Sequence, residues 1–305
     1  MRLIRYSRGG AAARTGLVCA VHESCLVELP APTATAAPAD DSGPELLRAL
    51  ARLAPGGDLA VTPRDGEHLP WATVELRPVV ERPGKVLAVG CNFVSHRDEA
   101  LRAGEQLPEP TRPYLFAKMP STVAADGQDV FVPRGGRCLD YEVELTVVIG
   151  STCRAVAPEE ALSHVAGYTV ANDLTLREVL FTGQGLFEAK NFDGFLPLSS
   201  VLVPTASAGD PRDLRLRTRV NGDVRQSETM AGAYFSCAEL VSYASHRMTL
   251  DPGDLILCGT PSGVAAFADD PASQYLNDSD RVVAEIEGVA SVTSIVRTGG
   301  GLSVD

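Results

Sequence analysis

The chain has 305 residues, of which 45% are hydrophobic, and its formal net charge at pH 7 is -12. This composition predicts a substantial core in one large domain with a smaller one, and it excludes a chain that is disordered throughout. The negative charge argues against a nucleic-acid or anionic-membrane partner, since phosphate binding needs a positive surface. No apolar run approaches a membrane span and the first residues lack a signal-peptide core, so we expect a soluble, cytoplasmic protein.

The cysteines and lysines carry a weaker signal. Seven cysteines, an odd number with no C-x-x-C spacing, fit reduced thiols better than a disulfide framework or a zinc site. Of the 27 basic residues, three are lysines (Lys85, Lys118 and Lys190), which leaves 24 arginines. A lysine kept where arginine is the default raises the question of whether a compact ammonium group is needed there, with chance placement as the alternative.

Residues 1–82 are predicted to form a small N-terminal α/β module. Short apolar runs predict strands, a Pro/Ala-rich loop follows them, and the apolar spacing from Glu45 to Ala54 predicts a short helix. The predicted domain boundary lies near Pro83 and Gly84, where the pattern changes to a succession of strands.

Residues 83–305 are predicted to form a β-rich domain of the α+β class. Asn221 and Gly222 supply the positive φ angles of a tight hairpin turn, and a second hairpin is expected near Gly288. Helices are expected over 158–166 and over 236–247, where Ser236 is the predicted N-cap. The predicted strands cover residues 85–90, 114–118, 129–133, 141–150, 166–173, 198–204, 214–227, 254–259 and 281–297.

The most informative segment is LDYEVELTVVIG, residues 139–150, because it carries two carboxylates in a β-branched, apolar run. Side chains alternate along a strand, so Glu142 and Glu144 are expected on one face, where their repulsion favours a divalent cation between them. Carboxylates without histidine or thiolate favour a hard ion such as Mg²⁺, Mn²⁺ or Ca²⁺. Asp173, at the end of the next predicted strand, would complete the site, with helix capping as its alternative role.

Three further segments carry candidate catalytic groups. In a helical turn, His96 and Glu99 lie on one face, where the carboxylate would orient the imidazole as a general base. Lys190 has apolar and aromatic neighbours and would stabilise an oxyanion or enolate, with an ion pair to a nearby acid as the alternative. The glycines around Thr260 permit close backbone approach and expose donors suited to a carboxylate.

These segments together resemble the fumarylacetoacetate hydrolase family, from about Gly84 to Arg297. The resemblance implies a mixed β-sandwich roll catalytic domain, usually a homodimer, that uses Mg²⁺ or a similar ion. The matching segments are GCNFVSHRDE, YLFAKMPST, LDYEVELTVVIG, AGYTVANDLTLRE, AKNFDGFLPLS, VNGDVRQ and LDPGDLILCGTPSGV.

Site roles follow from the resemblance residue by residue. It implies metal binding by the three carboxylates, a histidine and glutamate dyad on a mobile lid segment, an active-site lysine and a substrate-binding group. Two departures stand out, since Leu180 replaces a frequent glutamine and Phe93 a frequent tyrosine near the dyad. The implied residues are Glu142, Glu144 and Asp173 for the metal, His96, Glu99 and Lys190 for catalysis, and Arg177, Thr260 and Phe93 for the substrate.

The expected activity is metal-dependent hydrolysis of a C–C bond in a small β-diketo acid of the acylpyruvate or fumarylacetoacetate type. Isomerisation or decarboxylation of a 2-oxo diacid is the main alternative, because both also pass through an enolate. The aliphatic Leu180 keeps open a tailoring enzyme of secondary metabolism. A non-catalytic metal-binding scaffold is the least favoured, because the dyad, the lysine and the carboxylates are all present.

Overall fold

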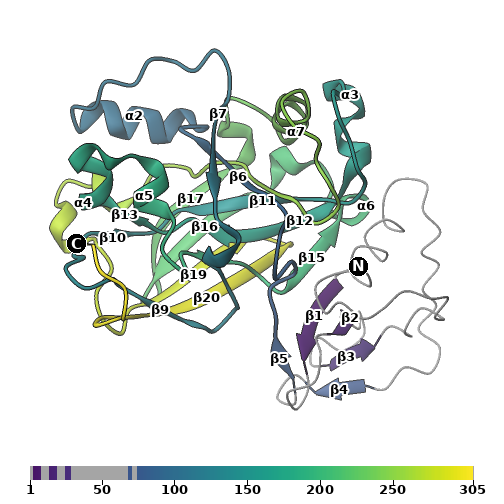
Figure 1. Cartoon of the computed structure of the whole chain (residues 1–305), viewed down its shortest axis with the longest axis horizontal. Coiled ribbons are helices and arrows are strands. Elements are labelled where there is room, and N and C mark those ends of the chain that lie inside the picture. The colour runs from purple at the N-terminus through teal and green to yellow at the C-terminus, as the bar shows by residue number, and fades with distance from the viewer. Residues whose placement is uncertain (1–2, 8–13, 19–24, 29–67, 71–73, 305) are drawn as a thin grey trace.

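The computed structural model of the chain describes residues 3–7, 14–18, 25–28, 68–70 and 74–304. Two large β-sheets form its body, and the labelled helices lie above them and at their sides in the view (Figure 1). This strand-rich arrangement of mixed sheets confirms the expected α+β class. In the described ranges, no helix has both the length and the apolar character needed to cross a membrane.

The larger sheet is mixed, with β18 and β6 pairing in parallel and the other neighbours pairing antiparallel. Strand β1 pairs with β15, so the described N-terminal strands extend the sheet of the rest of the chain. The domain boundary and the homodimer stay predictions. The strands in sheet order are β4 (His68–Pro70), β3 (Cys25–Glu28), β2 (Arg14–Val18), β1 (Leu3–Ser7), β15 (Val201–Pro204), β12 (Val165–Asn172), β11 (Val143–Ile149), β18 (Leu255–Leu257), β6 (Val86–Gly90) and β7 (Tyr114–Lys118), while β5 (Glu75–Leu76) pairs with β1.

The smaller sheet has five strands and contains both predicted hairpins. Asn221 and Gly222 have φ angles of 53° and 96°, as the tight turn requires, and Gly288 turns the second hairpin with a φ of 75°. The strands in sheet order are β17 (Asp223–Thr229), β16 (Arg215–Val220), β19 (Arg281–Ile286), β20 (Ala290–Arg297) and β9 (Asp129–Phe131). Two short pairs are β10 (Leu139–Asp140) with β13 (Thr175–Leu176) and β14 (Leu196–Pro197) with β8 (Val123–Ala124).

The helices are short. Helix α7 confirms the predicted helix at 236–247, and Ser236 and Glu239 form a capping box at its start. The helix predicted at 158–166 is shorter because Val165 begins β12, and the helix predicted at 45–54 lies outside the described residues. The helices are α2 (Val94–Arg102), α3 (Pro158–Ala161), α4 (Arg177–Val179), α5 (Leu186–Lys190), α6 (Thr205–Ala208) and α7 (Cys237–Ser245). Single turns are η2 (Pro120–Thr122), η3 (Leu162–His164), the π-helical η4 (Leu180–Gln184), η5 (Pro211–Asp213), η6 (Met230–Gly232), η7 (Ala265–Phe267) and η8 (Pro271–Ser273).

The main core lies between the two large sheets. Odd-numbered residues of β11, such as Val143 and Leu145, belong to the same buried cluster as Leu216 and Ile286 of the smaller sheet. Alternation along β11 then directs the even-numbered residues, Glu144 among them, to the opposite face of the larger sheet. The predicted one-face placement of the glutamates therefore puts them outside the main core.

Strand β11 begins later than predicted, at Val143 instead of residue 141. The reason is that side chains replace the neighbouring strand as hydrogen-bond acceptors here. The N–H of Glu142 donates to Asn172 Oδ1 at 2.9 Å, and the N–H of Val143 donates to Gln226 Oε1 at 3.0 Å. Glu142 is thus held by a side-chain amide immediately before the regular ladder.

Candidate metal and active site

Three carboxylates meet where β11 begins and β12 ends. Glu144 lies opposite Ala171 in the antiparallel register, and Val143 lies opposite Asn172, so Asp173 follows directly beside Glu142. One ligand oxygen from each of Glu142, Glu144 and Asp173 lies within 4.8 Å of the others, and all three residues are buried. The antiparallel pairing therefore brings together the three predicted metal ligands. Asp173 caps no helix, since β13 follows it.

The two glutamates of this cluster have opposite electrostatics. Burial opposes ionisation of Glu142, but the charges of Lys190 and Arg177 outweigh it and lower its pKa to about 2. Burial raises the pKa of Glu144 well above its usual range, and repulsion from Asp173 and Glu142 adds to this rise. Of the described residues, only Gly259 hydrogen-bonds the Glu144 carboxylate, through its N–H at 2.5 Å. Glu144 is therefore the carboxylate that lacks a cation.

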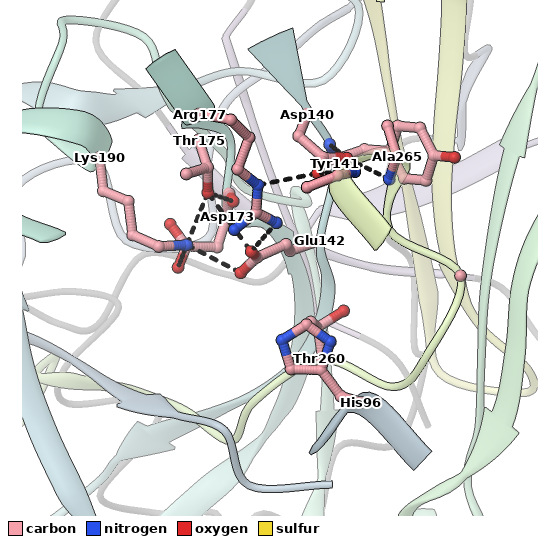
Figure 2. A network of polar contacts seen from close by, with 12 residues as sticks. His96, Asp140, Tyr141, Glu142, Asp173, Thr175, Arg177, Lys190, Thr260 and Ala265 are labelled. Carbon is pink, nitrogen blue, oxygen red and sulfur yellow. Dashed lines mark hydrogen bonds and ion pairs between the residues drawn. The ribbon is translucent and has the colours of Figure 1, made fainter. Parts of the chain in front are cut away.

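Lys190 points directly at the carboxylates (Figure 2). Its Nζ lies 2.7 Å from each of Glu142 Oε2, Asp173 Oδ2 and Thr175 Oγ1, so its three N–H donors are all in use. These acids, and not its chain neighbours Glu188 or Asp193, are its ion-pair partners. To donate to an oxyanion, Lys190 must release one of these bonds.

Lys118 is a member of the cluster that the motif analysis did not assign to the site. Its side chain is fully buried, and its Nζ lies 2.6 Å from Asp173 Oδ1 and 2.5 Å from the carbonyl oxygen of Lys190. The scarcity of lysine in the sequence was the signal for it. Two of the three lysines therefore meet at Asp173, where a compact ammonium fits between buried carboxylates.

Arg177 lies across the cluster and is fixed by a second aspartate. Its Nε donates to Asp140 Oδ2 at 2.8 Å, and its Nη2 donates to Glu142 Oε1 at 2.6 Å. Burial lowers the pKa of Arg177, but the charges of Asp140 and Glu142 more than reverse this and raise it. Sequence reasoning missed Asp140, which also accepts the N–H groups of Ala265 and Ala266 at 2.8 and 3.0 Å.

The predicted dyad forms on α2. His96 Nδ1 lies 2.7 Å from Glu99 Oε1, as the helical spacing predicts. Glu99 Oε2 accepts the N–H of Gly263 at 2.7 Å, so this carboxylate ties α2 to the loop after β18. His96 is near enough to Glu142 that its charge contributes to lowering the Glu142 pKa, and Figure 2 shows it facing Glu142 from the side opposite Arg177.

The loop that carries Thr260 uses its backbone donors in a way that differs from our expectation. The N–H groups of Gly259 and Gly263 bind the protein's own Glu144 and Glu99, so they are not open to a substrate carboxylate. Both glycines are required, since their φ angles are 89° and 101° and an added Cβ would lie 2.7 Å from Asn92 Cβ or 2.1 Å from the Arg225 carbonyl oxygen.

The Thr260 hydroxyl remains the group of this loop that is suited to a ligand. Gln226 Nε2 donates to its Oγ1 at 2.8 Å, while Gln226 Oε1 accepts from Thr218 Oγ1 and from the N–H of Val143. In the described part of the chain, no acceptor takes the Thr260 hydroxyl proton. Gln226 therefore positions the Thr260 hydroxyl and leaves the proton of that hydroxyl free to be donated to a ligand.

Phe93 lies at the start of α2 and differs from its expected role. Its side chain is completely buried in the main core cluster, among residues such as Leu145 and Val143. Packing in the core therefore accounts for an aromatic residue at position 93. It leaves the Phe93 ring holding α2 against the sheet, away from any surface that a substrate would reach.

The donor set fits a hard divalent cation. Three buried carboxylates converge without a histidine or thiolate among them, and oxygen ligands of this kind favour Mg²⁺, Mn²⁺ or Ca²⁺. Lys190 and Lys118 offset the charge of Glu142 and Asp173, but neither contacts Glu144. A cation at the cluster would offset the repulsion that adds to the effect of burial in raising the Glu144 pKa.

Two packed β-sheets carry a buried carboxylate cluster beside a histidine and glutamate pair, an arrangement typical of an enzyme active site. The family model described as fumarylacetoacetate hydrolase, C-terminal, matches residues 85–297. The chain therefore belongs to the fumarylacetoacetate hydrolase family and is an enzyme of that family.

Relatives from three organisms agree with this assignment. The chain is 37% identical over 230 residues to the mitochondrial oxaloacetate tautomerase FAHD2B of Homo sapiens. The aligned residues cover 75% of this chain and 71% of that protein. It is 37% identical over 246 residues to a 2,4-didehydro-3-deoxy-L-rhamnonate hydrolase of Sphingomonas sp., covering 80% and 82%. The solved fumarylacetoacetate hydrolase of Exiguobacterium antarcticum superposes with a TM-score of 0.81 at 32% identity, covering 98% of this chain and all of that one.

Proposed function

We propose that the chain is a metal-dependent hydrolase that cleaves a C–C bond in a small β-diketo acid of the acylpyruvate type. The observation that carries this proposal is the His96 and Glu99 dyad, paired at 2.7 Å and facing a buried carboxylate cluster. A hydrolase needs a base for water beside an electron-withdrawing centre, and the two groups meet that need.

The proposed metal ligands are Glu142, Glu144 and Asp173, and the proposed ion is Mg²⁺, with Mn²⁺ or Ca²⁺ as close substitutes. A divalent ion held there would polarise the 2-oxo and carboxylate oxygens of the substrate and favour enolate formation. The Thr260 hydroxyl would donate to the substrate carboxylate, and Gln226 would keep it in position.

The dyad supplies the proton transfer. When His96 Nδ1 donates to Glu99, its Nε2 is left to take a proton from water. That water attacks the distal carbonyl carbon, and the C–C bond then breaks with its electrons passing to the 2-oxo acid fragment. The fixed charge of Lys190 lowers the cost of the negative charge that develops. The fragment is finally protonated and leaves as the 2-oxo acid.

Tautomerisation or decarboxylation of a 2-oxo diacid is the second candidate. It is favoured by the 37% identity to an oxaloacetate tautomerase, since that reaction also requires an acid or base beside an enolisable 2-oxo acid. The two candidates differ in their products, because only hydrolysis splits the substrate into two carbon fragments by addition of water.

The test supplies acetylpyruvate or oxaloacetate with Mg²⁺ and follows pyruvate by lactate dehydrogenase, CO₂ release and the enol absorbance. We expect pyruvate and acetate from acetylpyruvate, loss of activity with EDTA, and a fall of about 10² to 10⁴-fold in kcat for His96→Gln. The exposed His246 provides a matched control, and His246→Gln should retain full activity. The second candidate would instead be established if oxaloacetate gave a change in enol absorbance or released CO₂ while acetylpyruvate gave no pyruvate.

A further inference from the structure

The aromatic ring of Phe267 lies close both to the dyad and to Arg177. Phe267, in η7, is half-buried, and its ring centroid lies 5.7 Å from that of His96. The guanidinium carbon of Arg177 lies 5.9 Å from the same centroid. The backbone just before Phe267 is fixed, because Asp140 accepts the N–H groups of Ala265 and Ala266. Asp140 therefore holds the backbone that places the Phe267 ring beside the dyad.

A second apolar residue shares the face of the helix that carries Arg177. Leu180 follows it by three residues where α4 continues into η4, a spacing that brings side chains together. Leu180 is half-buried and packs against a second group of buried side chains, which includes Leu176 and Val179. The Phe116 ring centroid lies 5.6 Å from Lys190 Nζ. Aromatic rings therefore lie beside two of the basic residues that pair with the carboxylates.

The cations at this place are already paired. Arg177 binds Asp140 and Glu142, Lys190 binds Glu142 and Asp173, and Lys118 binds Asp173. Among the described residues, these are the basic side chains in contact with the carboxylate cluster. A second carboxylate on the substrate would find these three basic side chains already paired, and burying it beside the apolar ring of Phe267 is costly.

We infer that Phe267 determines specificity, contacting the acyl group of the substrate, and that the preferred substrate carries an apolar or aromatic acyl group. This inference rests on the proposed function, in which His96 activates water beside the distal carbonyl. The acyl group bonded to that carbonyl then lies next to the His96 ring, where Phe267 stands. An aryl acyl group stacks on Phe267, whereas the terminal carboxylate of a diacid loses its hydration there.

The test measures kcat/KM for benzoylpyruvate, acetylpyruvate and succinylpyruvate, the last of which ends in a second carboxylate. The wild-type chain should prefer benzoylpyruvate over succinylpyruvate by at least about tenfold. Phe267→Ala should lower the ratio of benzoylpyruvate to acetylpyruvate kcat/KM by about tenfold, and Phe267→Leu by less. Phe131, which is 52% exposed on β9, gives the control Phe131→Ala, which should leave the ratio unchanged.

The outcomes separate this inference from the proposed function. Hydrolysis of all three compounds with an unchanged ratio in Phe267→Ala, or a wild-type preference for succinylpyruvate, overturns the inference and leaves the hydrolase intact. Failure of the wild-type chain to hydrolyse any of them, with Mg²⁺ or Mn²⁺ present, overturns both. A lower ratio in Phe267→Ala with an unchanged thermal midpoint supports the role in specificity, because a general loss of packing would lower both kcat/KM values together.

Discussion

The two glutamates of the E-x-E segment should respond oppositely to the same substitution in metal-free protein. Glu142→Gln should be strongly destabilising, and Glu144→Gln should be neutral or stabilising. Glu142 is the ionised partner of Lys190 and Arg177, whereas Glu144 contacts no cation and accepts a hydrogen bond from Gly259 alone among the described residues. A glutamine at 144 can still accept that bond through its amide oxygen.

The magnitude follows from the Glu142 pKa. Lowering it from 4.5 to about 2 corresponds to about 3 kcal/mol of stability at neutral pH. A second estimate of the same effect agrees with this value, because removing the charge leaves Lys190 and Arg177 short of a partner in a buried site, where breaking a pair costs about 3 to 5 kcal/mol. We therefore expect Glu142→Gln to lose about 3 kcal/mol of unfolding free energy at pH 7.

The pH dependence gives a second signature. The Glu142 pKa is lowered by folding, so its stabilisation is fully present above about pH 4.5 and is lost as the pH falls towards 2. The Glu144 pKa is raised by folding, so the wild-type chain loses stability as the pH rises above 4.5 through the folded value. Glu144→Gln should lack that loss, and its advantage over the wild type should grow with pH.

The assay is urea unfolding with EDTA at a series of pH values, paired with calorimetric titration of Mn²⁺ at pH 7. Both variants should bind Mn²⁺ far more weakly than the wild type, because each has lost a charged ligand. The reasoning would be refuted if Glu144→Gln destabilised the metal-free chain as much as Glu142→Gln, or if it bound Mn²⁺ as tightly as the wild type.

Two further predictions concern residues outside the E-x-E segment. Lys118→Met should lower the unfolding free energy in EDTA by about 2 to 3 kcal/mol. This is less than a complete loss of pairing would cost, because Asp173 keeps its ion pair with Lys190. Urea unfolding measures the change, and an unchanged free energy would contradict the buried pair. Ser95 donates to Glu228 and accepts the N–H of Ser262 at 3.1 Å, joining α2 to the loop after β18. Ser95→Ala should therefore lower kcat by about tenfold through a less ordered dyad, with Ser95→Thr closer to the wild type; equal kcat values would contradict this role.

The parts of the site that obey strand geometry were predictable from the sequence. Alternation along a strand placed Glu142 and Glu144 together, and the next strand in the chain returned antiparallel to bring Asp173 beside them. Helical spacing likewise paired His96 with Glu99. The placement of the two glutamates and of the dyad follows from a period of two and from a three-residue helical spacing, and Asp173 joins them because consecutive strands pair.

The contacts that escaped prediction join residues far apart in the sequence. Lys118 and Asp173 are 55 residues apart, and Arg177 and Asp140 are 37 residues apart, so no local pattern indicates which basic residue meets which acid. The glycine-rich loop after β18 was recognised as a source of donors. Its acceptors depend on how α2 and β11 pack against it, and they proved to be the protein's own carboxylates, Glu144 among them.

The loop of residues 259–266 anchors acidic side chains with main-chain N–H groups. The backbone of the loop thus holds the carboxylates, and its side chains are not needed for this role. Every amino acid except proline offers the same N–H, so most exchanges in the loop leave these anchors in place, Gly259 and Gly263 apart, since their positive φ angles demand glycine. Side chains projecting from the loop or directly after it, such as Phe267, can then be exchanged without displacing a carboxylate. We therefore expect such replacements to alter substrate preference while the backbone anchors of the carboxylates stay in place.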